Sequence, residues 1–306
     1  MAVEPALIAV ASIASEPIAS RAPAHLDARP NQALPEVIAA VRAARRGKRI
    51  PSGLMPPVGE LRDERLPYSL PHGCVPVAAS SQSASKICPT GHTKSRRTIV
   101  LIGDSHAQMW MPAVLRLAAW DNWRVVPLLR PGCTPDTWVD NRGLAACRPW
   151  YRWATREVKV LRPDVTLVGG AVGGYRGAAA RAAEHGIASM ARALKRVSRK
   201  VVVVGDPQGL SRNPLDCLLS RNASMARCTT TWAPERLRPY ENIAADARKL
   251  GVGFLDTQPW FCFEYQCPAV IGRAIAFKDG HHITAAYALH VAGTFTAAFR
   301  QATRRS

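Results

Sequence analysis

The 306-residue sequence is poor in acidic residues, with 22 Asp and Glu against 41 Lys and Arg, and its formal charge is +19. A strongly basic chain favours anionic partners such as an acidic polysaccharide, a membrane surface or nucleic acid. The basic residues are scattered and mostly arginine, and no nucleic-acid-binding motif is present, so we expect no nucleic-acid partner. A solvated basic surface without a specific partner is the simpler alternative.

The sequence also lacks a clear export signal and a long apolar run. Ala6–Ser20 is mildly apolar, but Glu16 and Pro17 interrupt it, no basic segment precedes it, and it is too short to span a bilayer. Residues 21–57 read as a linker with one helix, Leu34–Arg46, whose basic end could contact lipid head groups or be solvated. We therefore expect an N-terminal extension over residues 1–57 and one domain over residues 58–306.

No two cysteines have the short CxxC spacing of a zinc finger. Eight cysteines close in sequence and mostly in expected loops indicate disulfides and an oxidising, extracytoplasmic compartment. Because eight cysteines allow many pairings, the sequence alone leaves their connectivity open. Zinc binding and a cysteine nucleophile are the alternatives, although no metal site is indicated. The cysteines form four local groups: Cys74 and Cys88, Cys133 and Cys147, Cys217 and Cys228, Cys262 and Cys267.

Apolar strands alternate with amphipathic helices along most of the chain. Buried strands are expected at residues 98–102, 123–129, 164–168, 200–204 and 253–256, with helices between them and a last helix over 283–302. This alternation predicts an α/β fold, a three-layer α/β/α sandwich around a parallel sheet of about five strands. Pro127 argues that the second strand lies near a sheet edge.

The stretch TIVLIGDSHAQ, Thr98–Gln108, places a serine between the end of a buried strand and the start of a helix. Doubly wound sheets bind ligands at this position, and the helix N-terminus offers unpaired N–H groups to a developing oxyanion. Ser105 is therefore the candidate nucleophile, and Asp104 reads as a helix cap.

A serine needs a base to remove its proton, and Asp279 and His282 form an Asp-x-x-His pair near the other end of the chain. Asp279 could orient the imidazole of His282 while the other ring nitrogen faces Ser105, as in a Ser-His-Asp triad. The adjacent His281 is the alternative base.

GDSH after the first strand and D-x-x-H before the last helix resemble the SGNH hydrolase superfamily. The runs LIGDSHAQMWMPAVLRLAAWDNWRVVPLLRPGCTP and KDGHHITAAYA resemble the SGNH domains fused to membrane acyltransferases of acyltransferase family three. The resemblance implies an SGNH (flavodoxin-like) fold, the triad Ser105, Asp279 and His282, and sequential disulfide pairing. It also implies that residues 1–20 are a remnant of a membrane segment.

The resemblance further implies an oxyanion hole in which Gly132 supplies a backbone N–H. SGNH enzymes usually add an asparagine from the third block, but the loop after residue 168 contains glycines and no asparagine. Backbone N–H groups of that loop, including Gly170, could substitute, and His106 could steady the serine turn or lie beside the substrate. The loop is not a G-x-G-x-x-G motif, so no nucleotide cofactor is expected.

The function implied is O-acyl transfer, most simply of acetyl, to a cell-surface polysaccharide or glycolipid through an acyl-serine. A membrane acyltransferase domain or protein would supply the acyl group, and the domain would lie at the membrane surface outside the cytoplasm. The alternatives are a stand-alone carbohydrate esterase and a non-catalytic glycan-binding module.

Overall fold

The computed structural model describes residues 33–64, 73–76, 81–138 and 145–305, so the apolar stretch expected at 6–20 lies outside the described residues. A six-stranded sheet forms the middle layer, in the order β1–β3–β2–β4–β5–β7. As the sequence predicted, the central strands are parallel, and these are β3, β2, β4, β5 and β7. The short strand β1 pairs with β3 in the antiparallel direction at one edge. Their bounds are β1 Thr90–Gly91, β2 Thr98–Gly103, β3 Arg124–Leu129, β4 Val165–Gly169, β5 Lys200–Val204 and β7 Gly253–Leu255.

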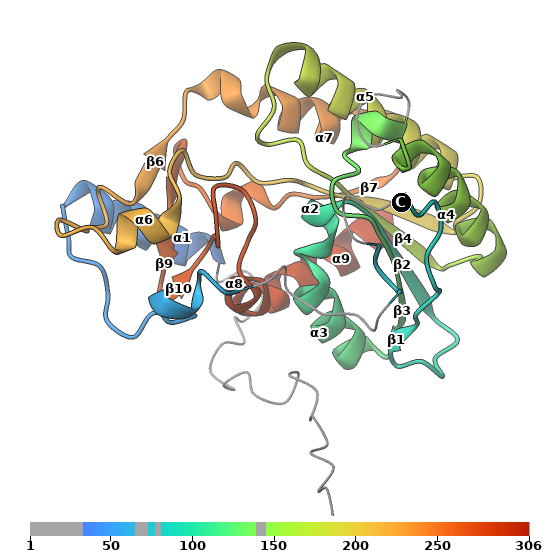
Figure 1. Ribbon diagram of the computed structural model, residues 1–306, viewed down its shortest axis with the longest axis horizontal. Coiled ribbons are helices and arrows are strands. Elements are labelled where there is room, and N and C mark those ends of the chain that lie inside the picture. The colour runs from blue at the N-terminus through green and yellow to red at the C-terminus, as the bar shows by residue number, and fades with distance from the viewer. Residues whose placement is uncertain (1–32, 65–72, 77–80, 139–144, 306) are drawn as a thin grey trace, which may run out of the picture.

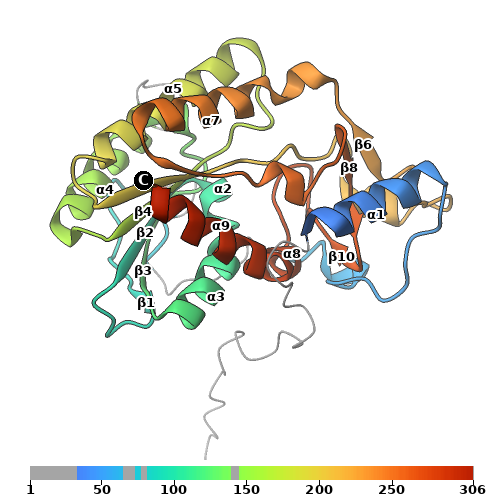
Figure 2. The same ribbon diagram turned by 180° about the vertical axis from the view of Figure 1, so that it is seen from behind.

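Helices cover both faces of the sheet and complete the expected α/β/α sandwich (Figures 1 and 2). Alternate strand residues face opposite layers: Ile99 and Leu101 pack with α3 and α9, whereas Val100 and Ile102 pack with α4 and α5. The helices are α1 Ala33–Arg45, α2 Ser105–Gln108, α3 Met111–Asp121, α4 Cys147–Leu161, α5 Gly177–Leu194, α6 Pro214–Leu218, α7 Arg238–Leu250, α8 Ala285–His290 and α9 Ala292–Arg305.

Two helices expected to be continuous are interrupted. The helix after Ser105 divides into α2 and α3, and Pro112 lies in the first turn of α3, where its missing N–H is no loss. The last helix begins at Ala285 after its cap, Thr284, and divides at Val291 into α8 and α9. α8 contacts β10 and α3, whereas α9 contacts β5, β7 and α3, so the two segments serve different packing surfaces.

A lobe of short elements lies beside the sheet (Figure 1). It contains two small antiparallel sheets, β9–β10 and β6–β8. α1 contacts β8 and β9, and the side chains of Ala33 and Val37 belong to the same apolar core as β2 and α3. The described part of the expected extension therefore shares the core of the domain. The bounds are β6 Thr229–Thr231, β8 Gln266–Pro268, β9 Val270–Ile271 and β10 Ala274–Ile275.

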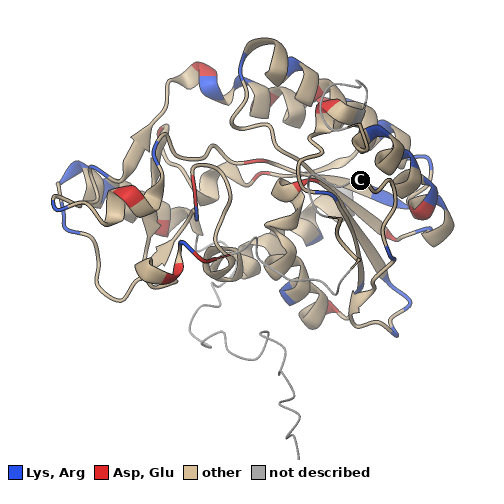
Figure 3. Cartoon of the chain, in the orientation of Figure 1, with Lys and Arg blue, Asp and Glu red and all other residues tan. Residues whose placement is uncertain are grey.

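Four disulfides join the loops around this framework in the sequential pairing Cys74–Cys88, Cys133–Cys147, Cys217–Cys228 and Cys262–Cys267. Lys and Arg are spread over helices and loops at both ends of the molecule and are not gathered on one element (Figure 3). Among the described residues, no helix combines the length and the apolar character needed to cross a membrane.

Candidate active site

Ser105 is the first residue of α2, directly above the carboxyl end of β2. The turn requires glycine at position 103, where φ is +150° and a Cβ would lie 1.9 Å from the carbonyl oxygen of Gly169. Asp104 caps α2, as expected, because its Oδ1 accepts the N–H of His106 at 2.7 Å. As the first helical residue, Ser105 has a backbone N–H without a partner inside the helix. Its N–H is therefore available to an oxyanion.

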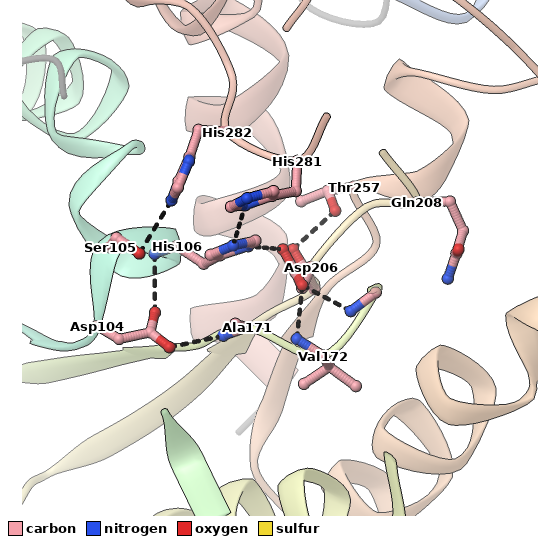
Figure 4. Close-up of polar contacts among 12 residues, drawn as sticks. Asp104, Ser105, His106, Ala171, Val172, Asp206, Gln208, Thr257, His281 and His282 are labelled. Carbon is pink, nitrogen blue, oxygen red and sulfur yellow. Dashed lines mark hydrogen bonds and ion pairs between the residues drawn. The ribbon is translucent and has the colours of Figure 1, made fainter. Parts of the chain in front are cut away.

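The two ends of the chain meet at this serine. The Nε2 of His282 lies 3.0 Å from the Oγ of Ser105 (Figure 4), and the Nδ1 of His282 lies 2.9 Å from the Oδ2 of Asp279. The structure therefore brings together the three residues expected to form a triad, and it places His282 rather than His281 against the serine. This geometry allows His282 to exchange a proton with Ser105 while Asp279 fixes the ring.

Asp279 is held in a short turn that keeps it ionised. Its Oδ1 accepts the N–H groups of His281 at 2.9 Å and of His282 at 2.7 Å. Partial burial raises the pKa of Asp279, but the hydrogen bonds from the side chain and backbone of His282 and from the backbone of His281 outweigh it, so the pKa is lowered well below the usual range. The carboxylate is therefore charged throughout the physiological range.

A second carboxylate–histidine chain runs beside the first. The Nδ1 of His106 lies 2.7 Å from the Oδ1 of Asp206, and its Nε2 lies 3.1 Å from the Nδ1 of His281 (Figure 4). Burial lowers the pKa of His106, but the charge and hydrogen bond of Asp206 raise it to about 9. A protonated His106 donates from both nitrogens, so the Nδ1 of His281 accepts and its Nε2 carries the hydrogen.

Asp206, just after the end of β5, is not among the site residues predicted from the sequence. Its side chain is buried, and besides the bond to His106 its Oδ2 accepts the N–H groups of Val172 and Gly173, each at 2.7 Å. These bonds and His106 lower the pKa of Asp206 against the effect of burial, which raises it. The signal in the sequence was its position directly after a parallel strand, at the same sheet edge as Ser105.

The glycine loop after β4 is tied to these carboxylates. The N–H of Ala171 donates to the Oδ2 of Asp104 at 2.9 Å, and the next two N–H groups donate to Asp206. Three of the backbone donors suggested as substitutes for the missing asparagine are therefore already engaged. Gly132 is exposed with φ +80°, and Gly170 is buried beside Pro135. Their assignment to the oxyanion hole remains a prediction.

His106, His281 and His282 offer ring nitrogens within 4.8 Å of one another, as a metal site would. The rings of His106 and His281 are 1° from parallel with centroids 5.2 Å apart, and their nitrogens face each other across 3.1 Å. The Nε2 of His106 and the Nδ1 of His281 therefore point at each other and share a hydrogen bond, and they do not point together at a metal position. The Nε2 of His282 is engaged by Ser105. The cluster is arranged to hold protons.

Comparison with known proteins agrees with this architecture. The family model for an SGNH domain fused to AT3 domains matches residues 73–297. No curated protein matches the chain significantly. Among solved structures, the periplasmic domain of a lipopolysaccharide acetyltransferase from Salmonella ser. Paratyphi A is 15% identical with a TM-score of 0.53. That similarity covers 69% of this chain and 86% of that domain.

Two similar structures are esterases or lipases by description. A GDSL-like lipase from Bacteroides thetaiotaomicron is 16% identical over 68% of this chain and 88% of its own, with a TM-score of 0.43. Axe2, an acetylxylan esterase from Geobacillus stearothermophilus, is 13% identical over 68% and 95% of the two chains, with a TM-score of 0.43.

The α/β/α sandwich with a serine at the end of a strand fits the SGNH hydrolase-like class of protein, which the family model also indicates. The chain belongs to the family of SGNH domains fused to AT3 domains, because the family model matches more than half of it. SGNH acyl transfer or ester hydrolysis is therefore its class of activity.

Proposed function

We propose that this domain transfers an acyl group, acetyl in the simplest case, to a hydroxyl of a cell-surface polysaccharide or glycolipid through an acyl-serine. The observation that carries the proposal is the continuous hydrogen-bonded chain from Ser105 through His282 to Asp279. Membership of a family whose SGNH domains are fused to AT3 domains supports a membrane acyltransferase as the source of the acyl group. The disulfides support a site outside the cytoplasm.

In the first half-reaction the Oγ of Ser105 attacks the acyl carbonyl and its proton passes to the Nε2 of His282. The bond from the carbonyl carbon to the donor's leaving group breaks, and the leaving group takes the proton from His282. Asp279 stabilises the imidazolium that exists between these transfers. The N–H of Ser105 donates a hydrogen bond to the oxyanion, and we predict that the N–H of Gly132 is a second donor.

In the second half-reaction an acceptor hydroxyl gives its proton to His282 while its oxygen attacks the acyl carbon. The bond to the Oγ of Ser105 breaks, and the serine recovers its proton. A sugar hydroxyl gives the acylated glycan, whereas water gives a free acid. We propose that the Nε2–H of His281 donates a hydrogen bond to a substrate oxygen beside His282. Asp206 and His106 hold His281 in the tautomer that carries its hydrogen on Nε2.

Hydrolysis of 4-nitrophenyl acetate by the oxidised protein tests the triad. Ser105→Ala and His282→Ala should each lower kcat by on the order of a thousandfold or more, because removal of either group eliminates the nucleophile or its base. His185→Ala, an exposed histidine on α5, serves as the matched control and should retain the wild-type rate.

The acceptor is tested by adding an acetyl-acceptor oligosaccharide to the same assay and measuring acetylated sugar and free acetate. More acetylated sugar than acetate supports transfer, and acetate alone supports the esterase. Equal, residual rates in wild type and Ser105→Ala would overturn the catalytic proposal and favour a glycan-binding module.

A further inference from the structure

A cavity of about 630 Å³ lies between the starts of α5 and α7, and its lining is dominated by arginine. Four arginines line it together with two aromatic side chains: Arg176, Arg181, Arg236, Arg238, Trp232 and Tyr175. Two glutamates, Glu184 and Glu235, also contribute, so the cavity carries excess positive charge. No salt bridge between described residues neutralises these arginines. The cavity therefore brings together positively charged side chains, which a bound anion would stabilise.

Arg236 is the arginine of this lining whose side chain is least satisfied by the protein. Its Nε and Nη1 are buried and have no hydrogen-bond partner among the described residues. Its guanidinium lies over the ring of Trp232, 4.8 Å from the centroid, which fixes its plane. Burial, followed by the nearby charge of Arg176, lowers the pKa of Arg236. Buried N–H donors without an acceptor are destabilising, and an oxyanion bound to the part of the guanidinium that lines the cavity would stabilise the charge of this arginine.

The protein backbone adds to the positive potential of the cavity. α5 begins at Gly177, which lines the cavity beside Arg176, and this helix start has no side-chain cap. A helix N-terminus favours negative charge, so it acts in the same direction as the arginines.

The cavity adjoins the candidate triad through a short chain of contacts. The indole N–H of Trp232 donates to the carbonyl of Gly209 at 2.9 Å. Gly209 packs against His281, and the neighbouring Leu210 donates its N–H to the carbonyl of Gly280 at 2.7 Å. On the other side, Tyr175 and Arg176 continue the glycine loop that is bound to Asp206. Hydrogen bonds and packing thus connect the lining of the cavity to the segment that carries His281 and His282.

We propose that this cavity is the acceptor subsite of the domain and that it binds an acidic group, a carboxylate or a phosphate, on the glycan. Arginine binds both anions through paired N–H bonds, and Trp232 and Tyr175 contribute aromatic surface to the lining, which suits a sugar ring. The role as acceptor subsite rests on the proposed function. Anion binding itself does not, and it is measured separately.

Isothermal titration calorimetry on the full Ser105→Ala chain tests the site without catalysis. The probes are tetragalacturonate, its methyl ester as the neutral match, and glucose 6-phosphate as the phosphate source. We expect tetragalacturonate or glucose 6-phosphate to bind at least tenfold more tightly than the ester. Adding Arg236→Ala or Arg176→Ala should weaken that binding by on the order of tenfold or more. Arg227→Ala, an exposed arginine of a different cavity, is the matched control.

The relative affinity of the two anionic probes distinguishes carboxylate from phosphate recognition, and preference for either one supports the proposal. Equal binding of tetragalacturonate and its ester, with no glucose 6-phosphate binding, would overturn it. An equal loss in Arg227→Ala would also overturn it, because the effect would then be a general one of charge. Arg176 is exposed, so its variant tests the site without disturbing the core even if Arg236→Ala unfolds. Failure of the 4-nitrophenyl acetate assay alone would affect the proposed function and not anion binding.

Discussion

Two aspartates and three histidines at one sheet edge make up two parallel proton chains. Asp279 orients His282 against Ser105, and Asp206 holds His106 against His281. The first chain was predictable because both of its motifs stand out in the sequence. The second was not, because His106 and Asp206 are 100 residues apart and each has an ordinary local interpretation. Only the folded sheet shows their contact, because it brings the segments that follow β2 and β5 together across the end of β4.

The His106–Asp206 pair should make stability fall at alkaline pH. The pKa of His106 in the folded protein, about 9, lies above its ordinary value of 6.5. Its contribution is therefore complete below about pH 6.5 and is lost as the pH rises through about 9, with a maximum of about 3 kcal/mol. Urea unfolding should show Asp206→Asn to be less stable than wild type at pH 6, with a smaller difference at pH 10.

Asp216→Asn, a substitution in the exposed lobe, should show no such pH-dependent difference. A deficit in Asp206→Asn that is the same at pH 6 and pH 10 would contradict the ion pair, since lost packing alone does not depend on the charge of His106.

At the level of helices and strands, hydrophobic periodicity in the sequence predicted which elements form. It predicted their boundaries less accurately. β5 has the bounds expected from the sequence, and β2 extends one residue further than expected, to Gly103. The divisions at Met109–Trp110 and Val291 were missed because apolar periodicity continues across both. Packing explains the second division, since α8 contacts β10 whereas α9 contacts β5 and β7, and a single-sequence pattern does not contain that information.

The close packing of Gly103 against Gly169 and Ala107 can be tested, because it positions the turn that carries Ser105. Gly103→Ala would place a Cβ 1.9 Å from the carbonyl oxygen of Gly169 and 2.8 Å from the Cβ of Ala107. We expect a loss of roughly 3 kcal/mol or more in unfolding free energy. Gly174→Ala is the control, since no heavy atom lies within 4 Å of its Cβ position. Similar urea midpoints for the two variants would refute this packing.

At the scale of the whole molecule, the loops at the edge of the sheet are closed by disulfides over short sequence separations. The sequence indicated disulfides, and the family resemblance implied their order. The arginine-lined cavity could not be predicted, because its residues come from the starts of two helices and a loop that only the fold brings together.

The chain-entropy account predicts how the disulfides rank in stability. Cys133 and Cys147 are separated by 14 residues, whereas Cys262 and Cys267 are separated by 5. Replacing the first pair by serine should lower the unfolding free energy by about 3 kcal/mol, and replacing the second by about 2 kcal/mol. Urea unfolding of both double variants checks this order, and a larger loss from the shorter loop would show that packing, not loop closure, dominates.

Peptide mass spectrometry would detect the proposed acyl-serine itself. The oxidised protein would be mixed with an activated acetyl ester, quenched in acid, digested and mapped, with Ser105→Ala treated in parallel. We expect one acetyl group on the peptide containing Ser105, absent from the variant and released faster by an acceptor sugar than by water. An acetyl group elsewhere, or an equal amount in the variant, would contradict an acyl-serine at this site.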